Sequence, residues 1–271
     1  MDQPHEDPVS IEHALPGLAI IRLNRPMRLN AMDVPSMRCL TEVLDAADAD
    51  PQLRVLVLTG TGRGFCAGLD LKSVLDGQGN FRLDAGEAYR LQEVFAGAVL
   101  RLRASHKIVI AAVNGVAVGA GFGLALACDL RFCSTEASFH VGAVGVGLSA
   151  GECGISYHLP RIVGATRAFE WMLTGRAIPA QEAISTGLVS DVVPAEALLE
   201  RALQAGREIL RHSPYSTSHT KRIMWTNVDA ASLHAAVELE NHTQVLALMT
   251  QDFAEAARAF AHKRDPVFRG R

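Results

Sequence analysis

Two glycine-rich stretches, each placed directly after a short apolar run, constrain the fold of this chain more than any other feature. The run Arg54–Thr59 (RVLVLT) leads into GTGRGFCAG, and Ile108–Val113 (IVIAAV) leads into NGVAVGAGFG. Short β-branched runs of this kind are typical of strands that are buried on both faces of a parallel sheet. The repeated order of strand, glycine loop and helix therefore predicts an α/β fold in which each loop joins a buried strand to a helix.

Hydrophobic patterning extends this order over the first two-thirds of the chain. Val9–Ala14 and Leu18–Leu23 predict a hairpin, and Asp33 is placed to cap a helix. Helical spacing of apolar residues returns over Glu87–Ala104, and from Ala195 onward the pattern is helical almost to the end. We therefore predict an α/β core over residues 1–200 and a helical segment over residues 201–271.

Composition excludes several classes of function. The chain has 271 residues, of which 49% are hydrophobic, and this is enough to bury a large core. Its net charge of −3 predicts no nucleic-acid or membrane partner, and no apolar run approaches the roughly 20 residues that span a bilayer. The acidic start MDQPHEDPVS does not resemble a targeting peptide, and the five scattered cysteines and ten histidines show no metal-ligand spacing. We expect a reduced, cytoplasmic protein without metal.

The two glycine loops allow three interpretations. The glycines serve only tight turns and packing, or they bind a dinucleotide, or both loops together form an oxyanion hole. Neither loop has the G-x-G-x-x-G spacing with an acid downstream that a dinucleotide site needs. Unpaired N–H groups in the first turn of a helix, aided by the helix dipole, stabilise a developing oxyanion, and this is usually the largest single term in catalysis.

Five blocks of residues, in the same order along nearly the whole chain, resemble the crotonase (enoyl-CoA hydratase/isomerase) superfamily. This resemblance implies a crotonase-like spiral of ββα units, followed by C-terminal helices that pack on neighbouring subunits in a homotrimer or a dimer of trimers. It also implies an acyl-CoA thioester as the substrate, with CoA as its carrier and no separate cofactor. The blocks are NRP with NAM from Asn24, GTGRGFCAGLDL from Gly60, NGVAVGAGFGLALACD from Asn114, LTG with AQEA and GLV from Leu173, and Phe253–Phe268.

The same resemblance assigns residues to the site. Backbone N–H groups of Leu69 and Ala120 correspond to the two donors of the family's oxyanion hole. Asp70 is a candidate for CoA binding, and its alternative role is to cap the helix that begins after it. The candidates for CoA binding are Ala67 for the adenine, the basic residues Arg28, Lys72 and Lys263 for phosphate, and Asp70.

The chain departs from the family at the acid/base positions. Hydratases of the family carry two glutamates, and here those positions are Gly123 and Ala143, neither of which can transfer a proton. Glu152, in GLSAGECGISYHLPR, is the candidate replacement, because related enzymes place an acid in the corresponding loop. A simple first-turn carboxylate at the start of a helix is the alternative for Glu152. His140, beside the missing glutamate, is the second candidate for the acid/base.

These residues leave the reaction open between several chemistries. The variant loop around Glu152 favours an enoyl-CoA hydratase of acyl-CoA or fatty-acid metabolism, whereas one acid/base suffices for an enoyl-CoA or dienoyl-CoA isomerase. Loss of both glutamates also permits a non-catalytic acyl-CoA-binding protein. Other crotonase chemistry, such as decarboxylation or thioester hydrolysis, would use the same oxyanion hole. Acyl length cannot be predicted from these residues.

Overall fold

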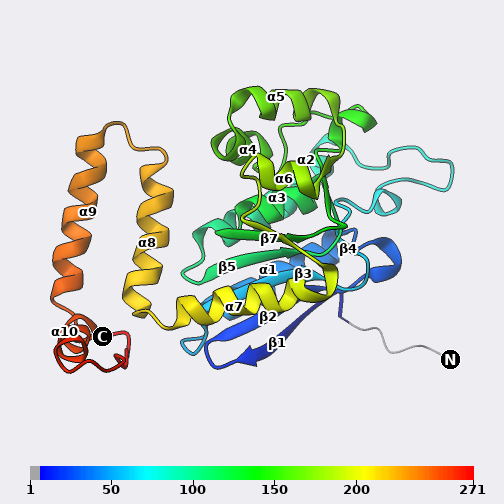
Figure 1. Cartoon of the computed structure of the whole chain (residues 1–271). Coiled ribbons are helices and arrows are strands. Elements are labelled where there is room, and N and C mark those ends of the chain that lie inside the picture. The colour runs from blue at the N-terminus through cyan, green and yellow to red at the C-terminus, as the bar shows by residue number, and fades with distance from the viewer. Residues whose placement is uncertain (1–6) are drawn as a thin grey trace, which may run out of the picture.

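The computed structural model describes residues 7–271, and its main sheet has six strands in the order β1-β2-β3-β5-β7-β10 (Figure 1). β1 and β2 form the predicted antiparallel hairpin, and all other neighbours in this sheet are parallel. The first six residues of the acidic start lie outside the described residues. The six strands are Val9–Leu15, Leu18–Leu23, Val55–Gly60, Ile108–Val113, Leu130–Ser134 and Asp191–Val193.

A second, four-stranded sheet has the order β4-β6-β8-β9. Its first three strands are parallel, and β9 runs antiparallel to β8. Three successive units place one strand in the main sheet, the next in this second sheet and then a helix: β3-β4-α2, β5-β6-α3 and β7-β8-α4. The predicted spiral of ββα units is therefore confirmed. The elements are β4 (Gly64–Cys66), β6 (Val116–Val118), β8 (Ser138–His140), β9 (Ile178–Pro179), α2 (Ala85–Ala104), α3 (Ala120–Ala127) and α4 (Ile155–Val163).

Both faces of the main sheet are buried, as the unbroken apolar runs predict. Along β3, Val55 and Val57 pack toward α7 (Leu198–Leu210), whereas the alternating Leu56 and Leu58 join the larger core on the other face. The larger core is covered by α1 (Val34–Ala49), which packs against α2. Four short 3₁₀ helices complete the connections: Pro26–Arg28, Leu71–Ser73, Ala143–Val146 and Ala195–Ala197.

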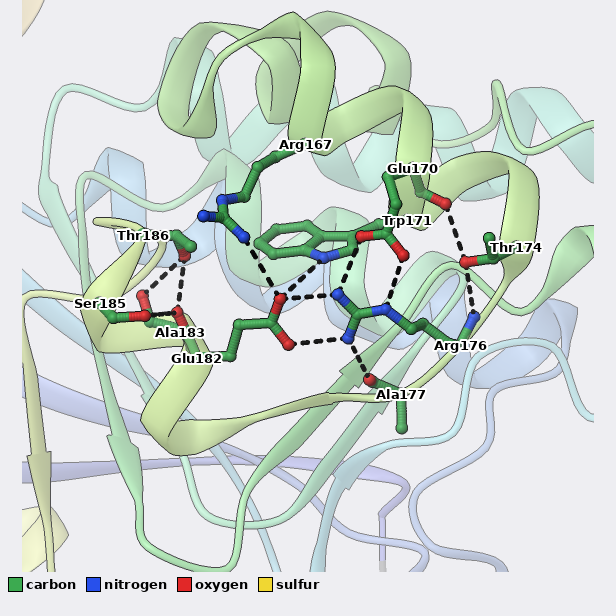
Figure 2. Close-up of polar contacts among 10 residues, drawn as sticks. All are labelled: Arg167, Glu170, Trp171, Thr174, Arg176, Ala177, Glu182, Ala183, Ser185 and Thr186. Carbon is green, nitrogen blue, oxygen red and sulfur yellow. Dashed lines mark hydrogen bonds and ion pairs between the residues drawn. The ribbon is translucent and has the colours of Figure 1, made fainter.

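Two helices above the second sheet, α5 (Ala165–Thr174) and α6 (Ala180–Ser185), are joined by a cluster around Arg176 (Figure 2). The Arg176 guanidinium forms bidentate contacts of 2.7 to 2.8 Å with Glu170 of α5 and 2.7 Å with Glu182 of α6. Glu182 also accepts a hydrogen bond of 3.3 Å from the indole of the fully buried Trp171. This cluster fixes α5, against which α4 packs.

The last three helices form an arm beside the core, as Figure 1 shows. They are α8 (Pro214–Asn227), α9 (Leu233–Leu248) and α10 (Gln251–Ala261). The predicted division at residue 200 falls inside α7, whose Ala202 is buried against the main sheet, and packing therefore places the start of the arm after α7. Apolar residues on α9 and directly after it are exposed in the single chain: Leu233, Val237, Val245, Leu246 and Met249.

Candidate active site

One cavity of about 140 Å³ brings together both glycine loops and Glu152. Ala67, Gly68 and Leu69 of the first loop line it from one side, and Gly119 and Ala120 of the second line it from another. Among the residues from 7 to 271 that line it, Glu152 is the only carboxylate. The structure thus gathers, in one place, three segments that are separate in the sequence, around residues 68, 120 and 152.

In the first loop, Leu69 pairs in a parallel bridge with Met32 that leaves its own N–H unused. The N–H of Met32 donates to the Gly68 carbonyl at 2.7 Å, and the N–H of Asp70 donates to the Met32 carbonyl at 2.8 Å. Because successive residues of an extended chain direct their amides to opposite sides, the Leu69 N–H faces away from this pairing. Over residues 7–271 it has no protein acceptor.

In the second loop, Ala120 is the first residue of α3. Gly119 caps this helix with a φ of 51°, a left-handed conformation that glycine adopts without a steric penalty. First-turn N–H groups have no partner inside their own helix, and the Ala120 N–H has no other acceptor in the described part of the chain. The positive end of the helix dipole adds to the attraction of this amide for negative charge.

Glycine is what allows the two loops to touch. A Cβ atom on Gly68 would lie 2.7 Å from the Val118 carbonyl oxygen and 3.6 Å from the Ala120 nitrogen. A Cβ atom on Gly121 would lie 2.2 Å from the carbonyl oxygen of Cys66, which is far inside van der Waals contact. The loops therefore approach backbone to backbone, and the amides of Leu69 and Ala120 reach the same cavity.

Glu152 lies in the turn before α4, close to the second loop. Its Oε1 is 3.0 Å from the position that a Cβ on Gly119 would occupy. Burial raises the pKa of the Glu152 carboxyl above its usual value, which favours a group able both to accept and to release a proton. Within residues 7–271, no N–H or side chain donates a hydrogen bond to this carboxylate, so its backbone turn alone holds it in place.

The structure does not bring the other sequence candidate for the acid/base to the cavity. His140 is absent from the lining residues, and its Nε2 lies 3.2 Å from the Ser138 hydroxyl. His140 contributes to the site through its backbone: its carbonyl accepts a hydrogen bond of 3.0 Å from the N–H of Gly119 in the second loop. Cys66, the other reactive residue near the loops, is fully buried, and this burial raises the pKa of its thiol to about 12.

The two positions at which the family carries glutamate differ in their surroundings. Ala143 lines the cavity, whereas Gly123 is packed against the segment that follows Glu152. A Cβ on Gly123 would lie 2.5 Å from the Cys153 carbonyl oxygen and 2.9 Å from the Cys153 Cβ. The chain around Cys153 therefore occupies the space into which any side chain at position 123 would extend.

The predicted CoA-binding residues occupy different places. Ala67 lines the cavity, and Arg28 is fixed beside the loop by an ion pair of 3.0 Å with Asp70. Asp70 is buried, also pairs with Arg25 at 3.1 Å, and accepts from the Lys72 N–H, as its capping role predicts. The Lys72 side chain is exposed. Lys263 follows α10, the last helix of the arm, and is not among the residues that line the cavity.

Several lining residues were not predicted from the sequence. Leu91, Gln92 and Phe95 of α2, together with Val146 and Leu148, complete the cavity wall. The helical period of α2 indicated an apolar face, but spacing alone does not reveal whether such a face packs on a core or on a ligand. Between residues 7 and 271 there is neither a helix able to cross a bilayer nor a group of three or more potential metal ligands.

Comparison with known proteins gives the family. The model of the enoyl-CoA hydratase/isomerase family matches residues 14–271. A curated relative, "Probable enoyl-CoA hydratase echA12" of Mycobacterium bovis, is 44% identical over 263 residues, which are 96% of this chain and 92% of the relative. The 1,2-epoxyphenylacetyl-CoA isomerase of Escherichia coli is 34% identical over 96% of this chain and 98% of its own. The crystal structure of an enoyl-CoA hydratase from Bacillus anthracis matches with a TM-score of 0.91 and 31% identity, covering 97% of this chain and all of that one.

Proposed function

The chain belongs to the enoyl-CoA hydratase/isomerase family, and we propose that it hydrates enoyl-CoA thioesters with Glu152 as its single acid/base. The observation that carries this proposal is the placement of one carboxylate beside two unpaired amides in one cavity. The name of the curated mycobacterial relative supports hydration as the reaction.

The two amides would act on the thioester carbonyl. Its oxygen would accept hydrogen bonds from the N–H groups of Leu69 and Ala120, which are fixed before substrate arrives. Such preorganised donors stabilise charge that develops during reaction, because they need no rearrangement at that moment. The enolate formed from the thioester would therefore be held by backbone alone.

Glu152 would serve twice in one turnover. Its carboxylate accepts a proton from water while the water oxygen bonds to Cβ, and the C=C electron pair moves toward the thioester oxygen as the enolate. The carboxylic acid then returns that proton to Cα, the carbonyl re-forms, and Glu152 is again a carboxylate. The pKa raised by burial suits this alternation of base and acid. No electron leaves the substrate, and the reaction as written uses neither metal nor redox cofactor.

Isomerisation is the second candidate, and the single carboxylate favours it. In a double-bond shift, Glu152 removes a proton from Cα of a 3-enoyl-CoA and returns it to Cγ, again through the enolate in the amide pair. This needs one acid/base and no bound water. The named activity of the Escherichia coli relative is also an isomerisation.

A second copy of the chain is part of the proposal. The exposed apolar residues of α9 and its C-cap, including Leu233 and Met249, would be covered in a homotrimer or a dimer of trimers. Lys263, which does not line the cavity of its own chain, would then be available to the CoA phosphates bound by a neighbour. Size-exclusion chromatography with light scattering measures this state directly, and a monomer would contradict it.

Mass spectrometry of the purified protein with saturated, 2-enoyl, 3-enoyl and dienoyl CoA thioesters distinguishes the reactions. Hydration adds the mass of one water to a 2-enoyl-CoA, whereas isomerisation leaves the mass unchanged and shifts chromatographic retention. The same samples with a chelator should react at an equal rate. Tight binding of every thioester without turnover of any would replace both reactions with a binding protein.

A further inference from the structure

The turn that carries Glu152 has an uncommon backbone conformation, which is closed by one hydrogen bond of 2.8 Å from the Ile155 N–H to the Glu152 carbonyl. Cys153 and Gly154 follow Glu152 with φ values of 45° and 74°, so two successive residues lie in the left-handed region. Non-glycine residues rarely adopt this conformation, and it persists where the surroundings determine it. Because no hydrogen bond from the described part of the chain fixes the Glu152 carboxylate, its position depends on the contacts that hold this turn.

His158 of α4 lies directly against that turn. A Cβ on Gly154 would be 3.2 Å from the His158 Cδ2 and 3.5 Å from its Nε2. His158 is 4% exposed, and its backbone N–H donates to the Gly154 carbonyl at 2.9 Å. The ring therefore supports the residue that connects Glu152 to α4.

Two groups from outside α4 hold the His158 ring. Arg103, at the end of α2, places its Nη1 3.2 Å from the His158 Nδ1. Since a guanidinium has only donors, Nδ1 must be the acceptor and the proton of the neutral ring sits on Nε2. Burial, and then the nearby Arg103 cation, lower the pKa of His158 to about 4, so the ring is neutral at ordinary pH.

Trp225 of α8, in the arm, contacts both His158 and Arg103. Its ring meets His158 edge-on with centroids 5.8 Å apart, and the Arg103 guanidinium lies 3.4 Å over its face. The Trp225 indole donates at 2.9 Å to Asp129, which is paired at 2.9 Å with the buried Lys221. The arm is thus tied into the core at the point where it touches His158.

A second contact joins the arm to the same helix. Asp229, just beyond α8, accepts a hydrogen bond from the Tyr157 hydroxyl and pairs with Arg161 at 3.0 Å. Both partners lie on α4. The arm therefore contacts α4 at residues before and after His158 in the sequence.

We propose that His158 is a positioning residue for Glu152: Arg103 and Trp225 lock its ring against Gly154 and so fix the turn that aims the carboxylate at the cavity. This inference rests on the proposed role of Glu152. It assigns to the arm a part in the chemistry of its own chain, separate from any contact with a second copy.

The test is a double-mutant cycle with kcat and substrate-analogue affinity measured separately. His158→Leu and Trp225→Leu should each lower kcat for a 2-enoyl-CoA by about 10²-fold, the loss typical of a misplaced catalytic group. Affinity for the saturated acyl-CoA should stay unchanged, because the amides of Leu69 and Ala120 are untouched. Trp225→Phe keeps a ring against His158 and should retain most of kcat. His219→Leu, which removes a stacked histidine elsewhere on α8, is the matched control.

The cycle separates a positioning role from a structural one. If His158 acts through Glu152, H158L should cause no further loss in an E152Q background, so the two effects are non-additive. If the kcat losses of H158L and E152Q multiply in the double variant, the inference is overturned while the role of Glu152 stands. Wild-type kcat in folded H158L and W225L would have the same consequence. Full activity of E152Q would overturn the proposed function instead, and the inference with it. Should H158L not fold, W225L in the E152Q background gives the same comparison.

Discussion

The two sides of the cavity are built in opposite ways. On the oxyanion side, the donors are backbone amides of Leu69 and Ala120, held by sheet pairing, a helix start and glycines packed to contact. On the acid side, one long side chain extends from a left-handed turn with no hydrogen bond to its carboxylate. Charge stabilisation is thus fixed by the fold itself, whereas proton transfer depends on packing around a single turn.

The largest expected effect on kcat comes from a change confined to the acid side of the cavity, at Glu152. Glu152→Gln keeps the shape and removes the titrating group, so kcat should fall by about 10²–10⁴-fold while affinity for a saturated acyl-CoA holds. Because burial raises the pKa of this carboxyl, the folded state disfavours its charge, and the variant should unfold at a temperature no lower than that of wild type at pH 7. Full activity would contradict the role of Glu152 as the acid/base and leave it a carboxylate without a catalytic role in the turn before α4. Stopped-time product analysis and thermal unfolding measure both quantities.

A change on the oxyanion side should be nearly as large. Ala120→Pro removes one donor, and loss of one such amide typically lowers kcat by about 10²–10³-fold. Proline is tolerated at the first position of a helix, where the N–H has no helical partner, so α3 should survive. Circular dichroism checks the fold before kinetics are measured. A folded variant with unchanged kcat would contradict the assignment of Ala120.

These two sides were also unequally predictable from sequence. The oxyanion side follows from patterns that repeat, because β-branched runs give strands and the glycines after them give close backbone approach. Where the strand bounds differ from the predicted runs, they differ by one residue, as Arg54–Thr59 against Val55–Gly60 shows. Glu152 was found only through a resemblance, since one acidic residue in a loop has no period or spacing of its own.

The support of Glu152 could not be predicted at all. His158 is met by Arg103 from α2 and Trp225 from α8, which are 55 residues before it and 67 after it. Nothing local in SYHLPR indicates these partners, because they depend on how the arm returns to the core. The helical pattern from Ala195 onward predicted a helix here, but not that α7 would cover the main sheet, because an amphipathic helix looks alike whether it covers a sheet or leaves it.

The two positions that lack the family's glutamates, Gly123 and Ala143, differ in packing, and the difference can be measured as a change in the free energy of unfolding. Gly123→Ala would force a Cβ to 2.5 Å from the Cys153 carbonyl oxygen, and overpacking of this kind lowers the free energy of unfolding by about 3 kcal/mol. It would also displace the turn that carries Glu152, so kcat should fall along with stability. Ala143→Ser, at a position that lines the cavity, is the matched control and should unfold close to wild type. Denaturant titration of both variants measures the difference, and equal midpoints would contradict the packing of Cys153 against Gly123.

The smallest expected effect is a pH dependence of stability on the acid side. The pKa of His158 is lowered from 6.5 to about 4 in the folded protein, so between these values the unfolded chain binds the extra proton. The stability that His158 contributes is therefore complete above about pH 6.5 and is lost as the pH falls. One pKa unit corresponds to about 1.4 kcal/mol, so the free energy of unfolding should be lower by about 2 kcal/mol at pH 5. Glu152, with a raised pKa, has the opposite sign, because its folded form takes up a proton first. Comparison of unfolding free energies of wild type and His158→Gln from pH 7 to 5 isolates the histidine: the difference between them should shrink as pH falls, and a constant difference would show that protonation of His158 does not disturb the contact with Arg103.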